Sequence, residues 1–140
     1  MDDPLRLLPG YALRRASAAQ MAAFNVRLAP LGLKFAEASV ILVIAANPGA
    51  TLSAIGRTLD IQRANMTPLV ARLEERGLIT RAAVNGRSWG LALSADGQKL
   101  KRGIDAAVHA HEAALVAQVP AAHRAALLPI LHALWASGTH

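Results

Sequence analysis

Apolar residues recur at helical spacing through the first third of the chain and predict two helices there. In residues 11–29 they return every three or four positions, the pattern of one long amphipathic helix, and Pro30 and Gly32 end it. Residues 35–46 are apolar nearly all round. A helix without a polar face is buried, so we expect this second helix at the centre of the fold.

Two shorter helices follow. Thr51 is a good N-cap type for a third helix with one apolar face, and residues 60–62 make a tight turn into a fourth helix over 63–76. Gly77 stands where a C-terminal glycine cap belongs. The apolar stripe of the fourth helix has the spacing i, i+3, i+4, i+7: Met66, Leu69, Val70 and Leu73.

The apolar period then changes to two, which predicts strands at 78–81 and 88–93. Asn85-Gly86 between them tolerates the positive φ angles of a hairpin turn. One face of the second strand carries its apolar residues: Trp89, Leu91 and Leu93. Ser94 then caps a fifth helix that extends to Gln118. A sixth begins at residues 119–120 and ends near Trp135, with a kink expected at Pro129.

This order describes a mostly α fold with a small β-hairpin wing. Two short helices joined by a tight turn and followed by a hairpin form a winged helix-turn-helix, so we expect one domain of residues 1–140 with such a head at 34–97. The head suits duplex DNA, because its second helix fits the major groove and a basic hairpin reaches the neighbouring minor groove. Residues 76–95 contain no acid, and three arginines lie in or next to the hairpin: Arg76, Arg81 and Arg87.

Composition and charge narrow the class of protein. The chain has 140 residues, of which 54% are apolar and none is cysteine, which excludes disorder, disulfides, cysteine-ligated zinc and thiol chemistry. Its longest uncharged apolar run, residues 38–46, is too short to span a membrane, and the N-terminus does not resemble a signal peptide. We therefore expect a cytoplasmic protein. A net charge of +6 favours a polyanionic partner.

The fourth helix offers a DNA-reading face opposite its apolar stripe. Small residues on that arc allow close approach to base edges, Asn65 suits adenine, and Arg63 or Arg72 suits guanine or phosphate. An ordinary solvated helix face is the alternative. Arg81 suits steadying the wing or touching phosphate, whereas Arg87 suits the minor groove. The candidate DNA-binding residues are Gln62, Arg63, Ala64, Asn65, Thr67, Pro68, Arg72, Arg81, Arg87 and Ser88.

Four segments, residues 59–62, 66–81, 85–88 and 93–97, resemble the MarR family of bacterial transcriptional regulators, with Leu-Glu-x-x-Gly-Leu-Ile-x-Arg at 73–81 as the most specific stretch. The resemblance implies a homodimer held by its terminal helices, here 5–33 and 98–138. It also implies binding to a palindromic operator and repression of a neighbouring gene. A phenolic or aromatic acid between those helices and the head commonly releases the DNA of such proteins.

Two positions depart from the family pattern. Asn85 and Gly86 stand where the wing usually has an acid and an arginine, which removes an ion pair and leaves Arg87 as the one clear minor-groove candidate. Gln62 replaces the usual Ser or Thr N-cap, which weakens the cap by roughly 1 kcal/mol. Thr67-Pro68 resembles the hydroperoxide-sensing branch, whose cysteine chemistry cannot operate here.

The first helix lines the effector pocket in that family. An arginine there could hold a carboxylate bidentately while an aromatic side chain packs on the ligand ring. Charges that face the dimer surface or the DNA are the alternative. We expect a small aromatic or carboxylate effector and no cofactor. The candidate effector-binding residues are Tyr11, Arg14, Arg15 and Phe35.

Five histidines raise the question of a metal: His109, His111, His123, His132 and His140. His109 and His111 are two apart on a helix and point apart, although His109 and Glu112 are better spaced, and we predict no metal site. The alternative is a ligand set completed in a dimer by His123 or His132. Neither a catalytic constellation nor a phosphate-binding glycine loop is present, which argues against an enzyme. The sequence therefore predicts a sequence-specific, nucleoid-associated bacterial regulator. The alternative is a winged-helix protein–protein interaction module without sequence-specific DNA readout.

Overall fold

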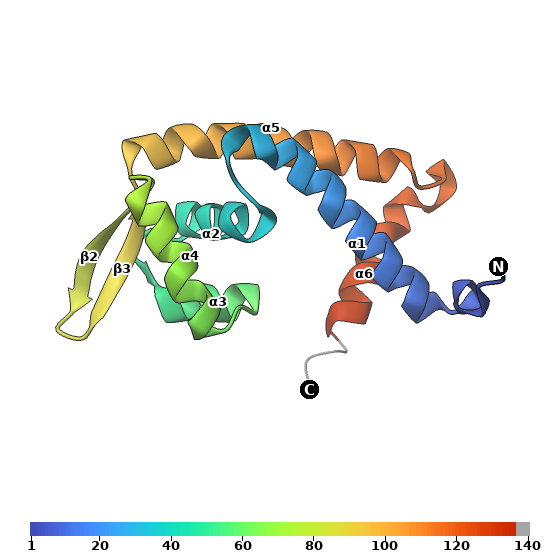
Figure 1. Ribbon diagram of the computed structural model, residues 1–140, viewed down its shortest axis with the longest axis horizontal. Coiled ribbons are helices and arrows are strands. Elements are labelled where there is room, and N and C mark those ends of the chain that lie inside the picture. Colours follow the sequence, from blue (N-terminus) through green and yellow to red (C-terminus); the bar gives the residue numbers. More distant parts are fainter. Residues whose placement is uncertain (137–140) are drawn as a thin grey trace.

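The computed structural model describes residues 1–136, which form a compact head and long helical arms (Figure 1). α5 extends from the wing past the head, α1 packs against its far half, and α6 folds back from its end. No single helix in this part of the chain is both long and apolar enough to cross a membrane. The elements are α1 (Pro9–Leu28), α2 (Phe35–Ala46), β1 (Ala50–Thr51), α3 (Leu52–Leu59), α4 (Arg63–Glu75), β2 (Ile79–Asn85), β3 (Ser88–Leu93), α5 (Ala95–Ala117) and α6 (Arg124–Ala136), with 3-10 helices at Pro4–Leu7, Ala29–Leu31 and Ala121–His123.

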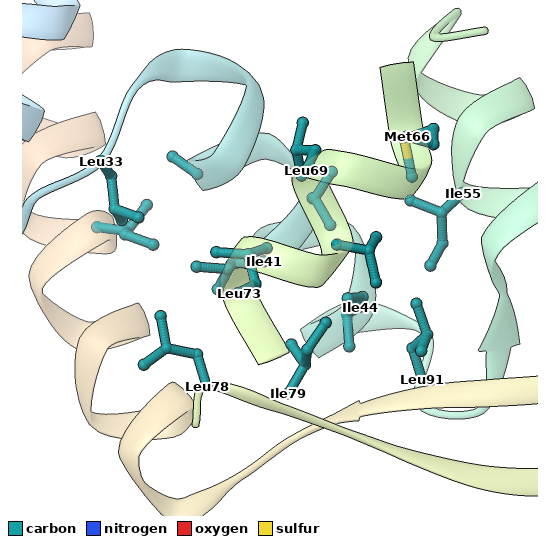
Figure 2. Packing of buried hydrophobic residues seen from close by; sticks show 14 of the residues in the cluster. Leu33, Ile41, Ile44, Ile55, Met66, Leu69, Leu73, Leu78, Ile79 and Leu91 are labelled. Carbon is teal, nitrogen blue, oxygen red and sulfur yellow. The ribbon is translucent and has the colours of Figure 1, made fainter. Parts of the chain in front are cut away.

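α2 lies at the centre of the head, as its apolar sequence predicts. Val40, Ile41 and Ile44 expose no surface, whereas Leu42 and Val43 on the other side are half-buried. α2 is surrounded by α3, α5, β3 and the apolar stripe of α4 (Figure 2). The buried cluster consists of Leu28, Leu33, Ala38, Val40, Ile41, Ile44, Ile55, Met66, Leu69, Val70, Leu73, Leu78, Ile79, Leu91 and Ile104.

The wing is part of a three-stranded antiparallel sheet in the order β1-β3-β2. β2 and β3 pair from Ile79–Leu93 to Asn85–Ser88, and β1 adds two residues on the other side of β3. The hairpin projects beyond the helices of the head, as Figure 1 shows. β3 has the predicted bounds, whereas β2 extends four residues further than the sequence indicated.

Helix ends in the head are fixed by the residues that the sequence analysis singled out. Thr51 Oγ1 accepts a hydrogen bond from Ala54 N at 3.2 Å, and Ser94 Oγ accepts one from Gly97 N at 3.0 Å. Gly77 has a φ of +70°, the left-handed conformation that glycine adopts without strain after a helix. Gln62 makes no side-chain cap, so the predicted weak start of α4 is confirmed.

The arms differ from the predicted layout in small ways. α1 begins at Pro9 and a 3-10 helix precedes it, while α6 begins at Arg124 after a separate 3-10 turn. No residue of α6 is buried. Residues 137 and 138 of the predicted terminal segment, and His140, lie outside the described residues.

Candidate nucleic-acid interface

The side of α4 opposite the core is open to a partner. Met66, Val70 and Leu73 expose no surface and Leu69 only 4%, so the helical period places the remaining residues outward. Every candidate residue on this helix is exposed: Gln62, Arg63, Ala64, Asn65, Thr67, Pro68 and Arg72. The predicted reading face of α4 is therefore a continuous exposed surface.

The proline within α4 alters that surface without ending the helix. Pro68 has no N–H, so the carbonyl of Ala64 lacks its usual helical partner. The hydroxyl of Thr67 donates to the carbonyl of Arg63 at 3.1 Å, which holds it close to the helix backbone. The outward arc carries small side chains and short polar groups, which allow a groove wall to approach.

A hollow of about 180 Å³ separates the start of α4 from the wing. Three arginines border it, from α4, β2 and the wing tip, and no acidic side chain is among the lining residues. Cationic and hydroxyl donors of this kind bind the phosphates of DNA. The lining residues are Thr51, Leu52, Ser53, Arg63, Arg81, Arg87, Ser88, Trp89 and Leu91.

Arg81 connects the wing to the reading helix. Glu74 Oε1 accepts hydrogen bonds from Nε of Arg81 at 2.9 Å and from Nη2 at 2.6 Å. The hydrogen bond to Glu74 raises the pKa of Arg81 above its ordinary value. The sequence left two roles open for Arg81, to steady the wing or to contact phosphate. The bonds to Glu74 serve the first of these.

Arg87 is at the tip of the wing and is exposed. Its backbone N–H donates to Asn85 Oδ1 at 2.9 Å, a local turn bond that shapes the tip. Within residues 1–136 no acidic side chain pairs with the Arg87 guanidinium. Asn85, which stands where the wing usually has an acid, therefore orders the turn. Because it is uncharged, it forms no ion pair with the Arg87 guanidinium. Ser88, the first residue of β3, is half-buried.

The candidate effector residues divide into two places. Arg15 Nη1 donates to Tyr11 Oη at 2.8 Å, and the guanidinium carbons of Arg14 and Arg15 each lie 5.7 Å from the Tyr11 ring centroid. The bond to Tyr11 raises the pKa of Arg15. Tyr11 and Arg15 line a hollow of about 590 Å³ together with Asp3, Arg6 and Ala12, and Arg14 is not among its lining residues. This cluster is a cationic site with one aromatic ring.

Phe35 lies apart from that cluster, at the other end of α1. Its ring packs edge-on against Phe24, with centroids 5.8 Å apart, and Phe24 stacks on the buried His111 at 4.9 Å. The backbone N–H of Phe35 donates to Asn25 Oδ1 at 2.9 Å. Within one chain, therefore, the structure does not bring Phe35 together with Tyr11, Arg14 and Arg15.

The histidines do not gather around a common point. Among the described residues no group of three His, Asp or Glu side chains lies close enough to hold a metal ion. His111 packs against Phe24 and His132 against Trp135, at 6.1 Å between centroids. These two histidines have packing roles in the arms.

The DNA-binding candidates chosen from the sequence do not include Glu74 or several residues that border the hollow, among them Ser53 and Trp89. Glu74 pairs with Arg81, Ser53 borders the hollow beside α4, and Trp89 borders it from the wing instead of lying in the core. The spacing of Glu74 and Arg81 across a helix and a strand gives no periodic signal. For Trp89, the Asn85-Gly86 turn only three residues earlier already placed it near the hairpin tip.

Comparison with known proteins accords with this geometry. A model of the MarR family matches residues 31–88, which include the helices of the head and most of the wing. The HTH-type transcriptional repressor Rv2887 of Mycobacterium tuberculosis is 30% identical over 122 residues, which cover 86% of this chain and 85% of the relative. A putative transcriptional regulatory protein for the hcr operon of Thauera aromatica is 29% identical over 129 residues, 90% of this chain and 78% of that protein.

Solved structures show the same similarity along nearly the whole length. The transcriptional repressor CouR bound to a 23-mer DNA duplex is 34% identical with a TM-score of 0.86, covering 93% of this chain and 94% of CouR. CouR bound to p-coumaroyl-CoA has a TM-score of 0.85 and is 32% identical, with 96% of each chain covered. Rv2887 in complex with salicylic acid has a TM-score of 0.72 and is 28% identical, covering 95% of this chain and 97% of that one. With its winged helix-turn-helix head and its helical arms, this chain belongs to the MarR family of transcriptional regulators.

Proposed function

We propose that this regulator is a repressor that binds a palindromic operator as a homodimer and leaves it when a small aromatic acid, or its CoA thioester, binds. The observation that carries the proposal is the continuous surface formed by the exposed face of α4, the arginine-lined hollow and Arg87. CouR, at 34% identity, is a repressor that binds duplex DNA. The protein acts by binding, without a catalytic step, in the bacterial cytoplasm on the nucleoid.

DNA readout follows from the placement of these groups. α4 enters the major groove, where Asn65 suits adenine and Arg63 or Arg72 suits guanine or phosphate. Arg87 enters the adjacent minor groove, and the strand between the two passes over the hollow. Two such heads related by a dyad read half-sites about one helical turn apart.

The effector hypothesis rests on the cationic cluster of Tyr11, Arg14 and Arg15. An arginine fork binds a carboxylate bidentately, and a phenol ring packs on an aromatic ligand. Salicylic acid bound to Rv2887 and p-coumaroyl-CoA bound to CouR are aromatic and anionic, the chemistry that this cluster would hold. Within one chain Phe35 lies apart from this cluster, so it contributes to such a site only if dimerisation brings it next to the cluster of the other protomer.

The competing function, a protein–protein interaction module, lacks a comparable observation. An arginine-lined hollow without acidic residues beside an exposed helix suits a nucleic acid strand. Rv2887, at 30% identity, and CouR, at 34%, are both repressors. We therefore favour sequence-specific DNA binding over that alternative.

Selection of bound duplexes from a random pool tests the proposal. We expect the purified protein to enrich an inverted repeat and to protect both halves in a footprint. Salicylate or p-coumaroyl-CoA should then lower its affinity, and Arg15→Ala should remove that response while DNA affinity stays unchanged. Failure to enrich any sequence would refute the DNA-binding function. Enrichment without a response to either compound would refute only the effector class.

A further inference from the structure

Trp89 is a large aromatic side chain that the head leaves uncovered. Its exposed fraction is 56%, whereas Leu91, two positions along the same strand, exposes 1%. Side chains two apart on a strand point to one side of the sheet, so both face the side that covers the core. The wing extends beyond that core, which is why the inward-facing position of Trp89 is not a buried one.

Within residues 1–136, nothing else takes up the exposed indole. Its cross-strand partner is Ala83, whose methyl group is too small to cover a ring. Neither an aromatic ring nor an arginine stacks on it in the described part of the chain. A tryptophan exposed to this extent on a strand has surface available for a partner.

The surroundings of the ring identify the chemistry of that partner. Trp89 borders the same hollow as Arg63 at the start of α4 and Arg87 at the wing tip. A DNA strand that passes from the major-groove helix to the minor-groove wing must cross this hollow. Such a strand offers phosphates to the arginines and the apolar carbons of deoxyribose to the indole.

We propose that Trp89 is a DNA-contacting residue, whose indole packs against the deoxyribose–phosphate strand between the reading helix and the wing. This inference rests on the proposed DNA-binding function and adds an uncharged contact to it. Because every nucleotide carries the same sugar, the contact strengthens binding to all sequences equally and does not select among them.

Salt titrations distinguish this contact from those of the arginines. With a duplex enriched from a random pool by the wild-type protein, we expect Trp89→Ala to weaken binding about tenfold, because the variant no longer buries the apolar surface of the indole against the sugars. The slope of log affinity against log salt should stay unchanged, because an uncharged side chain releases no counterions. Trp89→Phe should retain most of the affinity. Equal affinity of Trp89→Ala and wild type would overturn the proposal.

Fluorescence gives a second measurement that does not depend on how Trp89→Ala folds. The chain has two tryptophans, so Trp135→Phe leaves Trp89 as the sole indole emitter. We expect its emission to change on addition of the enriched duplex and to return when salt dissociates the complex. Unchanged emission at saturating DNA would refute the contact while leaving DNA binding intact. A wild-type protein that enriches no duplex would refute the proposed function itself.

Discussion

At the scale of single residues, the two wing arginines have different tasks because one has a carboxylate partner. Arg81 is held by Glu74, and an ion pair exposed to this degree contributes at most about 1 kcal/mol to stability. The pair acts mainly through geometry, because it connects β2 to the last turn of α4. Arg87 has no such partner among the described residues and remains free to insert into a groove.

Replacement of Arg87 tests that division. Arg87→Ala should weaken operator binding and lower the salt slope by about one for each phosphate that Arg87 neutralises, or about two for a dimer. The measurement is a gel-shift titration over a range of salt concentrations. Arg102→Ala, an exposed arginine on α5, is the matched control and should leave both quantities unchanged. An unaltered slope for Arg87→Ala would contradict its role.

The hydroxyl of Ser94 connects the start of α5 to the end of α4. Its Oγ accepts from the N–H of Gly97, which caps α5, and donates to the carbonyl of Gly77 at the end of α4. Ser94→Ala should therefore lower the free energy of unfolding by about 1–2 kcal/mol. Urea denaturation measures the change, and Ser17→Ala, at an exposed position within α1, should cost less than half as much. Equal effects of the two substitutions would argue against the capping role.

At the scale of elements, Arg76 is the connection between the reading helix and the arms. It directly follows α4, and its Nη1 and Nη2 donate to the carbonyls of Gly32 at 2.9 Å and Leu31 at 3.0 Å, in the link between α1 and α2. These bonds fix the end of α4 relative to the helix that carries Tyr11 and Arg15. We therefore expect a movement of α1 on effector binding to be transmitted directly to α4.

Loss of this connection should loosen the spacing between heads without unfolding them. We expect Arg76→Gln to keep the helix content and oligomeric state of the wild type. It should lower the affinity for the natural operator. It should also reduce the further loss of affinity that one base pair inserted between the half-sites causes, which we call the insertion penalty. Gel shifts with the two duplexes measure that penalty. Lys101→Gln, which breaks the exposed pair with Asp105 on α5, is the control. A penalty as large as that of wild type would contradict the connection.

Elements with a local signal were predictable from the sequence, and those defined by distant partners were not. The bounds of α2 and β3, the caps at Thr51 and Ser94 and the turn at Gly77 follow from neighbouring residues. By contrast, the two-residue strand β1 exists only because it pairs with Leu91 and Gly90. The alanines of β2 have little preference for a strand, so its length depends on β3.

Contacts in the site follow the same rule. Exposure of the α4 face follows from its apolar period, so the exposed candidates on this helix could be chosen from the sequence alone. Glu74–Arg81 and Arg76–Gly32 join residues through folding, and no spacing rule indicates them. The period of two places Trp89 on the same face of the strand as Leu91, which is buried. The exposure of Trp89 depends on where the core ends, which a period of two does not encode.

At the scale of the whole molecule, the arms carry an apolar surface that one chain cannot bury. α6 has no buried residue although most of its positions are apolar, and Leu128, Leu131 and Trp135 expose 60%, 37% and 71% of their surfaces. Their spacing places them on one stripe of the helix. An isolated apolar helix of this kind is unfavourable in water, so a second copy is the expected cover.

A charge on that stripe should separate the protomers and thereby test the dimer. Leu131→Glu should shift the protein to a monomer in sedimentation experiments, because a carboxylate cannot be buried in an apolar contact without a partner. The monomer would keep a folded head, since α6 contributes nothing to its core. Its operator affinity should fall by about a hundredfold or more and its salt slope should halve, because one head replaces two. Gln98→Glu, which adds the same charge at an exposed position of α5, should remain dimeric. A Leu131→Glu protein that stays dimeric and binds the operator as wild type does would show that α6 lies outside the interface.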